Sequence, residues 1–167
     1  MSFQGLLDLL RRLPAFPALA DGDQSPPQSL FQAARPYVVA GIATSHPGPL
    51  LLITSRSEIA GQLIEQMETW LPDAQEGSPR LHLFAEPDAL PYERISWSNA
   101  ARQQRLTTLA ALQSRRSRSS PLVIASARSL MHYTLPAREL RLALRPVKVG
   151  EIVRLDQMTR QWVQTGY

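Results

Sequence analysis

Apolar residues gather in three short runs, the second of which begins with Arg80 and is interrupted by His82, separated by longer stretches in which they recur at helical spacing. The runs lie at residues 50–54, 80–85 and 122–126, between turn-forming or charged residues. A continuous apolar run of this length is typical of a strand buried on both faces, and we expect this of 50–54 and 122–126. Strands that alternate with helices predict an α/β fold with a parallel sheet covered by helices.

The stretches between the runs predict amphipathic helices. One is expected to begin with a capping box from Ser55 to Glu58, whose hydroxyl and carboxylate would satisfy free amides at the helix start. A second is expected over residues 100–113. The apolar side chains predicted to face inward are Ile59, Leu63, Met67, Trp70 and Leu71 in the first helix, and Leu106, Leu109 and Leu112 in the second.

The N-terminal part differs from this alternation. Leucines at helical spacing over residues 1–13 predict a short amphipathic helix that packs on the domain. Residues 14–28 are rich in Pro, Asp, Gly and Ser, which predicts a loose connection. A helix is expected around residues 30–43, because Pro36 is tolerated in a first turn. We therefore treat 1–34 as an N-terminal helix and connection.

The C-terminal part changes character again. Residues 140–153 alternate in places like an edge or antiparallel strand, with Gly150 as a turn, and 155–165 predict a helix. These elements are too few to bury a core of their own. We expect one α/β domain over 35–138 and the incomplete beginning of a small second α+β domain over 139–167.

Composition narrows the function classes. Among the 167 residues there is no cysteine, which removes disulfides, thiolate zinc sites and cysteine nucleophiles, and fits a cytoplasmic location. No stretch approaches the roughly 18 uncharged apolar residues of a membrane span, so no membrane partner is expected. The chain also holds a single lysine, Lys148, with no glycine pair before it. A Walker-type phosphate loop is therefore absent from the sequence, and we expect no bound cofactor.

Carboxylates gather after the second strand, where α/β sheets carry their functional groups. They are Glu86, Asp88 and Glu93, in a loop framed by Pro87 and Pro91. An ion pair between Glu93 and Arg94 would account for part of this loop, and we do not expect catalysis. Tyr92 and Trp97 flank the same loop, either as an exposed anchor for a partner protein or, as we favour, folded back onto the domain.

The histidines suggest no metal site. His46, His82 and His132 lack the spacing of a ligand pair on one element. His82 alternates with leucines along the second strand, and we expect a hydrogen-bonded structural histidine there.

Arg115, Arg116 and Arg118 form the densest basic patch. Arginines between serines can bind phosphate with salt-dependent affinity, but no aromatic residue is interleaved to stack on bases. A solvated linker is the favoured interpretation, and weak nucleic-acid binding is the alternative.

Several blocks together resemble the N-terminal region of the bacterial transcription-repair coupling factor (Mfd) family. The first is Leu-Phe-Ala-Glu-Pro-Asp-Ala-Leu-Pro-Tyr-Glu-Arg-Ile-Ser at 83–96, followed by Arg105, Leu106 and Leu109. Further blocks lie at 123–131, 134–136, 148–151 and 166–167, so the resemblance covers most of 35–167. One departure is Ser-Trp-Ser-Asn-Ala at 96–100, where the family commonly has Ser-Pro-Ser and then a carboxylate.

The resemblance implies a degenerate P-loop or helicase-like domain, similar to domain 1a of the damage-recognition protein UvrB but without its ATPase motifs. In the family this domain supports an inserted, UvrB domain 2-like domain that recruits UvrA. The UvrA-facing surface follows position 167, so no residue here is assigned to it. The full-length family members are ATP-dependent DNA translocases that act on stalled RNA polymerase.

The expected function is therefore that of a non-catalytic scaffold in nucleotide excision repair. Two alternatives remain open. One is a fragment of a nucleic-acid-dependent ATPase or helicase, and the other is a small basic DNA-binding module that uses Arg115, Arg116 and Arg118.

Overall fold

The computed structural model describes residues 3–20, 29–71, 80–89, 92, 96–113, 120–144, 147 and 149–164. The chain divides into two compact units, residues 1–132 and 133–167. We call them unit 1 and unit 2.

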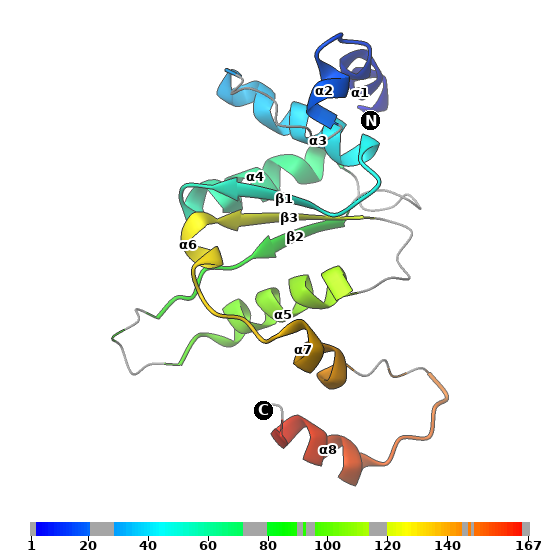
Figure 1. Ribbon diagram of the computed structural model, residues 1–167, viewed down its shortest axis with the longest axis vertical. Coiled ribbons are helices and arrows are strands. Elements are labelled where there is room, and N and C mark those ends of the chain that lie inside the picture. Colours follow the sequence, from blue (N-terminus) through cyan, green and yellow to red (C-terminus); the bar gives the residue numbers. More distant parts are fainter. Residues whose placement is uncertain are drawn as a thin grey trace. The chain divides into compact units, whose positions relative to one another are not determined.

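Unit 1 is built on a three-stranded parallel sheet (Figure 1). Its strands are β1 (Leu50–Thr54), β2 (Arg80–Phe84) and β3 (Pro121–Ser126), in the order β1-β3-β2. The register aligns Leu122 of β3 with Leu50 on one side and Leu81 on the other. The predicted parallel sheet packed against helices is confirmed.

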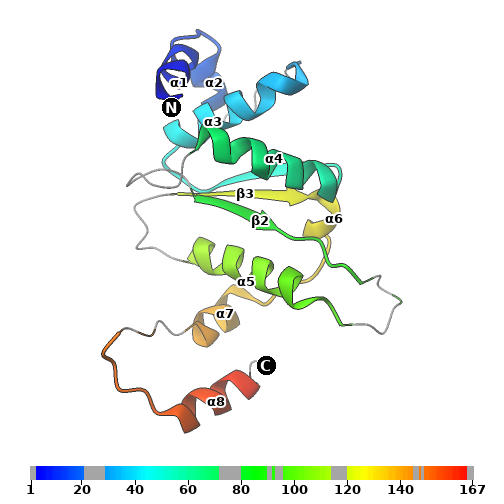
Figure 2. The same cartoon turned by 180° about the vertical axis from the view of Figure 1, so that it is seen from behind.

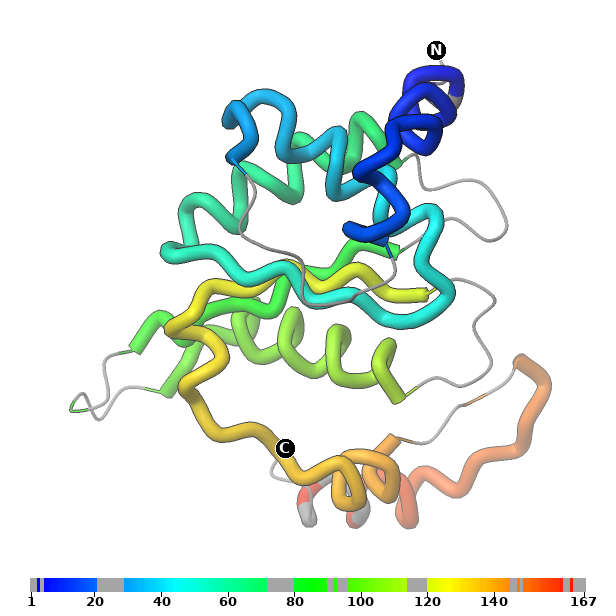
Figure 3. Tube along the Cα trace, turned by 45° about the horizontal axis from the view of Figure 1, so that its top comes forward, coloured from blue at the N-terminus to red at the C-terminus, as the bar shows by residue number. Residues whose placement is uncertain are grey.

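Helices cover both faces of this sheet (Figures 1 and 2). On one face α4 (Ser57–Trp70) packs on the strands, and α3 (Arg35–Ser45) packs on α4 after the 3-10 turn η1 (Gln32–Ala34). On the other face α5 (Asn99–Gln113) packs on β2 and β3, as the tube in Figure 3 also shows. The short α6 (Ala127–Leu130) follows β3 directly.

The main core lies on the α4 side of the sheet. Met67 and Ile124 are both fully buried there, and the rings of Phe3 and Tyr37 each lie 5.1 Å from that of Trp70. The buried members of this core are Leu7, Ala40, Ala43, Ala60, Met67, Leu71, Leu122 and Ile124.

The N-terminal leucines form the predicted amphipathic helix, α1 (Gln4–Arg11). Leu7 and Leu10 are buried against α3, whereas Leu6 and Leu9 are exposed. A Cβ at Gly41 of α3 would come within 2.4 Å of Leu10 Cδ2, so Leu10 packs directly over this glycine and would have to shift for any larger residue.

The loose connection predicted over 14–28 is wrong for its first part, which contains α2 (Phe16–Ala20). The Phe16 side chain is buried beside Leu10 and Val38, and this burial stabilises the short helix, in which Pro17 lies in the first turn where proline is tolerated. Residues 21–28 lie outside the described part of the chain.

The expectation that β1 is buried on both faces is also wrong. Leu51 and Ile53 are 52% and 56% exposed, because β1 is an edge strand and α5 covers only β2 and β3. The same expectation is confirmed for β3, the central strand, whose residues from Leu122 to Ser126 are all buried.

The predicted capping box is wrong, because α4 is capped at Arg56 without a side-chain hydrogen bond. Thr54, the last residue of β1, instead donates to the Arg56 carbonyl at 2.8 Å. The predicted apolar stripe of α4 is largely confirmed: Met67 and Leu71 are buried, but Ile59 is 39% exposed.

Unit 2 contains α7 (Ala137–Ala143) and α8 (Leu155–Gln164). The strand predicted over 140–153 is wrong: its first residues belong to α7, and the described residues between α7 and α8 form no strand. The run Ala-Arg-Glu-Leu-Arg-Leu-Ala consists of strong helix formers and begins after Pro136, which explains the helix. The turn at Gly150, with φ +88°, and the final helix are confirmed.

Among the described residues, none of the helices combines the length and the apolar character that crossing a membrane would require.

Candidate functional site at the carboxyl end of the sheet

The carboxyl ends of the three parallel strands meet at one edge of the sheet, the place where open α/β sheets bind their ligands. Thr54 ends β1, Phe84 ends β2 and Ser126 ends β3. The groups that could act on a ligand therefore come from these strand ends and from the residues that follow them.

Glu86 and Ser126 connect the ends of β2 and β3. The Ser126 hydroxyl donates to Glu86 Oε2 at 3.0 Å, and Glu86 Oε1 forms an ion pair with Arg128 at 3.0 Å. Ser126 also caps α6, because its Oγ accepts a hydrogen bond from the Ser129 amide at 3.0 Å. The Ser129 hydroxyl donates back to the Ser126 carbonyl at 2.7 Å. Each of these side chains therefore has a partner within the chain.

Arg105 of α5 donates to carbonyls in the two segments that follow β2 and β3. Its Nη1 donates to the Ala85 carbonyl at 2.8 Å and to the Ser129 carbonyl at 3.1 Å. Its guanidinium lies 3.9 Å from the centre of the Phe84 ring and 5.4 Å from that of Trp97. Only 4% of this residue is exposed.

The buried charge of Arg105 is held without an ion pair among the described residues. Removal from water disfavours a cation, and burial accordingly lowers the pKa of the Arg105 guanidinium. Carbonyl oxygens and an aromatic face offset part of this cost. Nη2 is buried and has no hydrogen-bond partner.

The inward face predicted for α5 is wrong, because Leu106 and Leu112 are 41% and 47% exposed. The buried residues are Ala101, Arg105 and Thr108, and Leu109 packs as predicted against the core on this face.

Thr108 contributes to this inward orientation. Its hydroxyl has two carbonyl acceptors, that of Leu83 in β2 at 3.0 Å and that of Gln104 in its own helix at 2.9 Å. Sequence reasoning missed Arg105 and Thr108 as inward residues because it ranked positions by hydrophobicity. The usable signal was the spacing of 101, 105 and 108, which also forms one helical face.

The carboxylates predicted to cluster do not share a partner. Asp88 accepts hydrogen bonds from the Ser98 amide at 2.9 and 3.2 Å, and hydrogen bonding from Ser98 lowers the pKa of this carboxyl. Glu86 pairs with Arg128 instead. Glu93 and Arg94 lie outside the described residues.

The two aromatic residues of the loop differ. Trp97 is folded back as favoured, with its ring edge-on to His132 at 5.9 Å, whereas Tyr92 is 80% exposed.

The three histidines lie on separate elements. His46 Nδ1 lies 3.3 Å from the Ala20 carbonyl. The buried Nε2 of His82 has no hydrogen-bond partner. Burial, with a contribution from Arg80, lowers the pKa of this histidine. Among the described residues no group of three His, Cys, Asp or Glu could hold a metal ion.

The predicted basic patch of Arg115, Arg116 and Arg118 lies outside the described residues, as does Lys148. The structure therefore assigns these side chains no contacts, and they remain sequence-based predictions.

The turn from β1 to α4 is the place where a phosphate loop would lie. It consists of Ser55 and Arg56, because β1 ends at Thr54 and α4 begins at Ser57. A Walker loop needs about six residues with two glycines between strand and helix, so that backbone amides can surround the phosphates. This turn is too short and carries neither glycine nor lysine.

Neither models of known protein families, nor curated proteins, nor solved structures give a match to this chain.

Proposed function

We propose that this chain is a non-catalytic, UvrB-like scaffold from the N-terminal part of a transcription-repair coupling factor. In this role it supports the recruitment of the UvrA repair machinery to RNA polymerase stalled at DNA damage. The proposal extends the resemblance of the blocks at 83–96 and 123–131, and it assigns unit 1 a supporting role without nucleotide chemistry.

One observation carries the proposal: the carboxyl end of the sheet is occupied by contacts within the chain. Glu86, Ser126 and Arg105 bond to neighbouring residues or carbonyls, and the turn at Ser55 and Arg56 is too short to surround a phosphate. An α/β sheet of this kind keeps its architecture while the position that would bind a ligand serves to hold strands and helices together.

The test measures UvrA capture by the gene product that carries this sequence. Met67→Asp places a carboxylate in the core of unit 1 and should unfold it, whereas Met131→Asp changes a residue that is 82% exposed. We expect Met67→Asp to abolish UvrA capture and Met131→Asp to leave it unchanged. A product that still captures UvrA although circular dichroism shows unit 1 unfolded would contradict the supporting role.

The DNA-binding alternative is tested with a labelled duplex over a range of salt concentrations. The scaffold proposal expects no binding by this chain at physiological salt. Affinity that falls steeply with salt and is lost in the triple variant Arg115→Ala, Arg116→Ala, Arg118→Ala would favour the DNA-binding module instead.

A further inference from the structure

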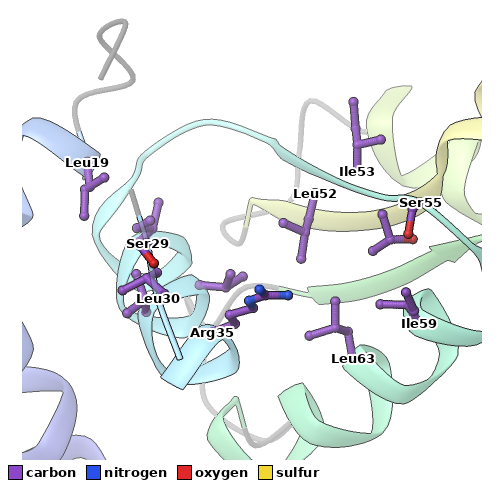
Figure 4. A pocket seen from close by; sticks show the side chains of 13 residues that line it. Leu19, Ser29, Leu30, Arg35, Leu52, Ile53, Ser55, Ile59 and Leu63 are labelled. Atoms are coloured by element: carbon purple, nitrogen blue, oxygen red, sulfur yellow. The ribbon is translucent and has the colours of Figure 1, made fainter. Parts of the chain in front are cut away.

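The outer edge of β1 lies in an open apolar groove of unit 1. The groove runs between α3, β1 and α4, and Figure 4 shows its lining side chains. Its main contributors are Leu30, Arg35, Ile42, Leu52, Ile53 and Leu63.

The groove reaches both faces of β1. Leu52 and Ile53 both line it, and successive residues of a strand point to opposite faces, as these two do in Figure 4. A single groove can contact both side chains only by passing around the backbone edge of the strand. Because β1 is at the end of the order β1-β3-β2, this edge has no neighbouring strand in the described sheet. Its outward N–H and C=O groups can accept one.

The apolar surface continues on both sides of this edge. On the α5 side of the sheet, where α5 does not extend over β1, Leu51 and Ile53 are each more than half exposed. On the other face, Ile59 is 39% exposed and lines the groove with Leu63. An added strand would bury apolar side chains on both of its faces, which distinguishes β1 from an edge protected by charge.

One charge enters the groove. Arg35, the first residue of α3, reaches into it, and none of the described residues that line it is acidic. Among the described residues Arg35 has no ion pair. The N-terminal end of α3, where the helix dipole is positive, lies at the same place. The Arg35 guanidinium and this helix end would therefore both stabilise a carboxylate bound in the groove.

We propose that the outer edge of β1 accepts an extended segment of a partner protein as a fourth strand. The segment carries apolar residues that alternate across its two faces and a carboxylate that pairs with Arg35. This is recognition by strand addition, in which main-chain hydrogen bonds supply affinity and side-chain pockets supply specificity. The inference rests on unit 1 alone and does not depend on the role proposed for UvrA.

The test uses a synthetic mixture of seven-residue peptides with an acetylated N-terminal aspartate. Each of the six following positions is Val, Ile, Leu or Thr, so that both faces of an added strand carry apolar groups. Amide hydrogen exchange, measured by NMR on the whole chain, reports which strand the peptides contact. We expect slower exchange at outward-facing amides of β1 and no change along β2, the other edge strand. No slowing in β1 at millimolar peptide, or slowing confined to β2, would overturn the proposal.

Two variants examine the contacts. Ile53→Lys puts a charge on the strand edge and should remove the protection of β1, whereas Ile152→Lys, at a position that is 95% exposed in unit 2, should not.

Replacing the peptide aspartate by asparagine should weaken binding about two- to fivefold, the size of an exposed ion pair. Arg35→Gln should remove this difference between the two mixtures. A difference that persists in Arg35→Gln would overturn the assignment of Arg35.

A second copy of this chain is the competing occupant. Sedimentation of the free protein detects such self-association as a mass that rises with protein concentration. A self-associating edge would also slow exchange of β1 amides without peptide, and this protection would increase with protein concentration. That result would overturn the partner-protein proposal.

Discussion

The two faces of the sheet in unit 1 are covered by helices of similar length that are attached in different ways. α4, with 14 residues, inserts Ala60 and Met67 into an apolar core. α5, with 15 residues, inserts Arg105 and Thr108, which bond to carbonyls of β2 and of the segments after β2 and β3. The α4 interface is apolar, whereas the α5 interface combines a smaller apolar cluster, which Leu109 contacts, with matched donors and acceptors.

The difference shows what each face tolerates. An apolar interface is non-directional and accepts other apolar side chains of similar volume. A buried donor at a carbonyl has a fixed direction, and its removal leaves the acceptor without a partner in a poorly solvated place. The α5 face therefore fixes where the ends of β2 and β3 lie relative to each other, and the α4 face supplies the bulk of the burial.

The largest effect is expected on the apolar face. Met67→Ala should lower the free energy of unfolding by about 2 to 5 kcal/mol, because Met67 is fully buried and its removal leaves a cavity. Urea unfolding followed by circular dichroism measures this. Met131→Ala, at a position 82% exposed, should change stability by less than about 0.5 kcal/mol.

A somewhat smaller effect is expected at the polar junction. Arg105→Ala should cost about 2 to 3 kcal/mol in urea unfolding, because the Ala85 and Ser129 carbonyls lose their donor. Arg102→Ala, on the exposed side of the same helix, is the matched control and should be near zero. Equal stability of the two variants would show that the junction contributes nothing.

Thr108→Val should cost about 1 kcal/mol, because it removes the donor shared by the Leu83 and Gln104 carbonyls while keeping the side-chain volume. Thr107→Val, at the exposed neighbouring position, is its control. A Thr108→Val variant as stable as the control would show that burial of Thr108 is sufficient without its hydrogen bond.

The smallest effect concerns pH. The pKa of His82 is lower in the folded chain than its unfolded value near 6.5, so the unfolded state binds more protons between the two values. Stability should therefore rise with pH through this window and be fully present above about 6.5. His82→Val should flatten this rise when urea midpoints are compared at several pH values. An unchanged slope would assign the pH dependence to other groups.

The sequence was sufficient for the features that depend on hydrophobic periodicity. The three strands, the amphipathic α1 and most of the α4 stripe follow from apolar spacing, because burial decides where these residues lie. The sequence was insufficient where hydrogen bonds of polar side chains determine which residues of a helix face the sheet. Arg105 and Thr108 face inward because carbonyls at the end of β2 need donors, and those carbonyls become visible only once the strands are placed.

Two other errors have a similar origin. An apolar run alone does not distinguish a central strand from an edge strand, so Leu51 and Ile53 were expected to be buried. Their exposure depends on strand order, which is a long-range property. At 140–153 the partial alternation predicts a strand, but the high helix propensity of residues 137–143 determines the structure at its start.

The central claim is that the carboxyl end of the sheet is a structural junction and not a nucleotide site. Titration of this chain with labelled ATP and magnesium, followed by fluorescence anisotropy and by the thermal unfolding midpoint, tests it most directly. The account predicts no saturable anisotropy change and an unchanged midpoint up to millimolar ATP. Saturable binding with a rise in the midpoint, abolished by Arg105→Ala but not by Arg102→Ala, would contradict it.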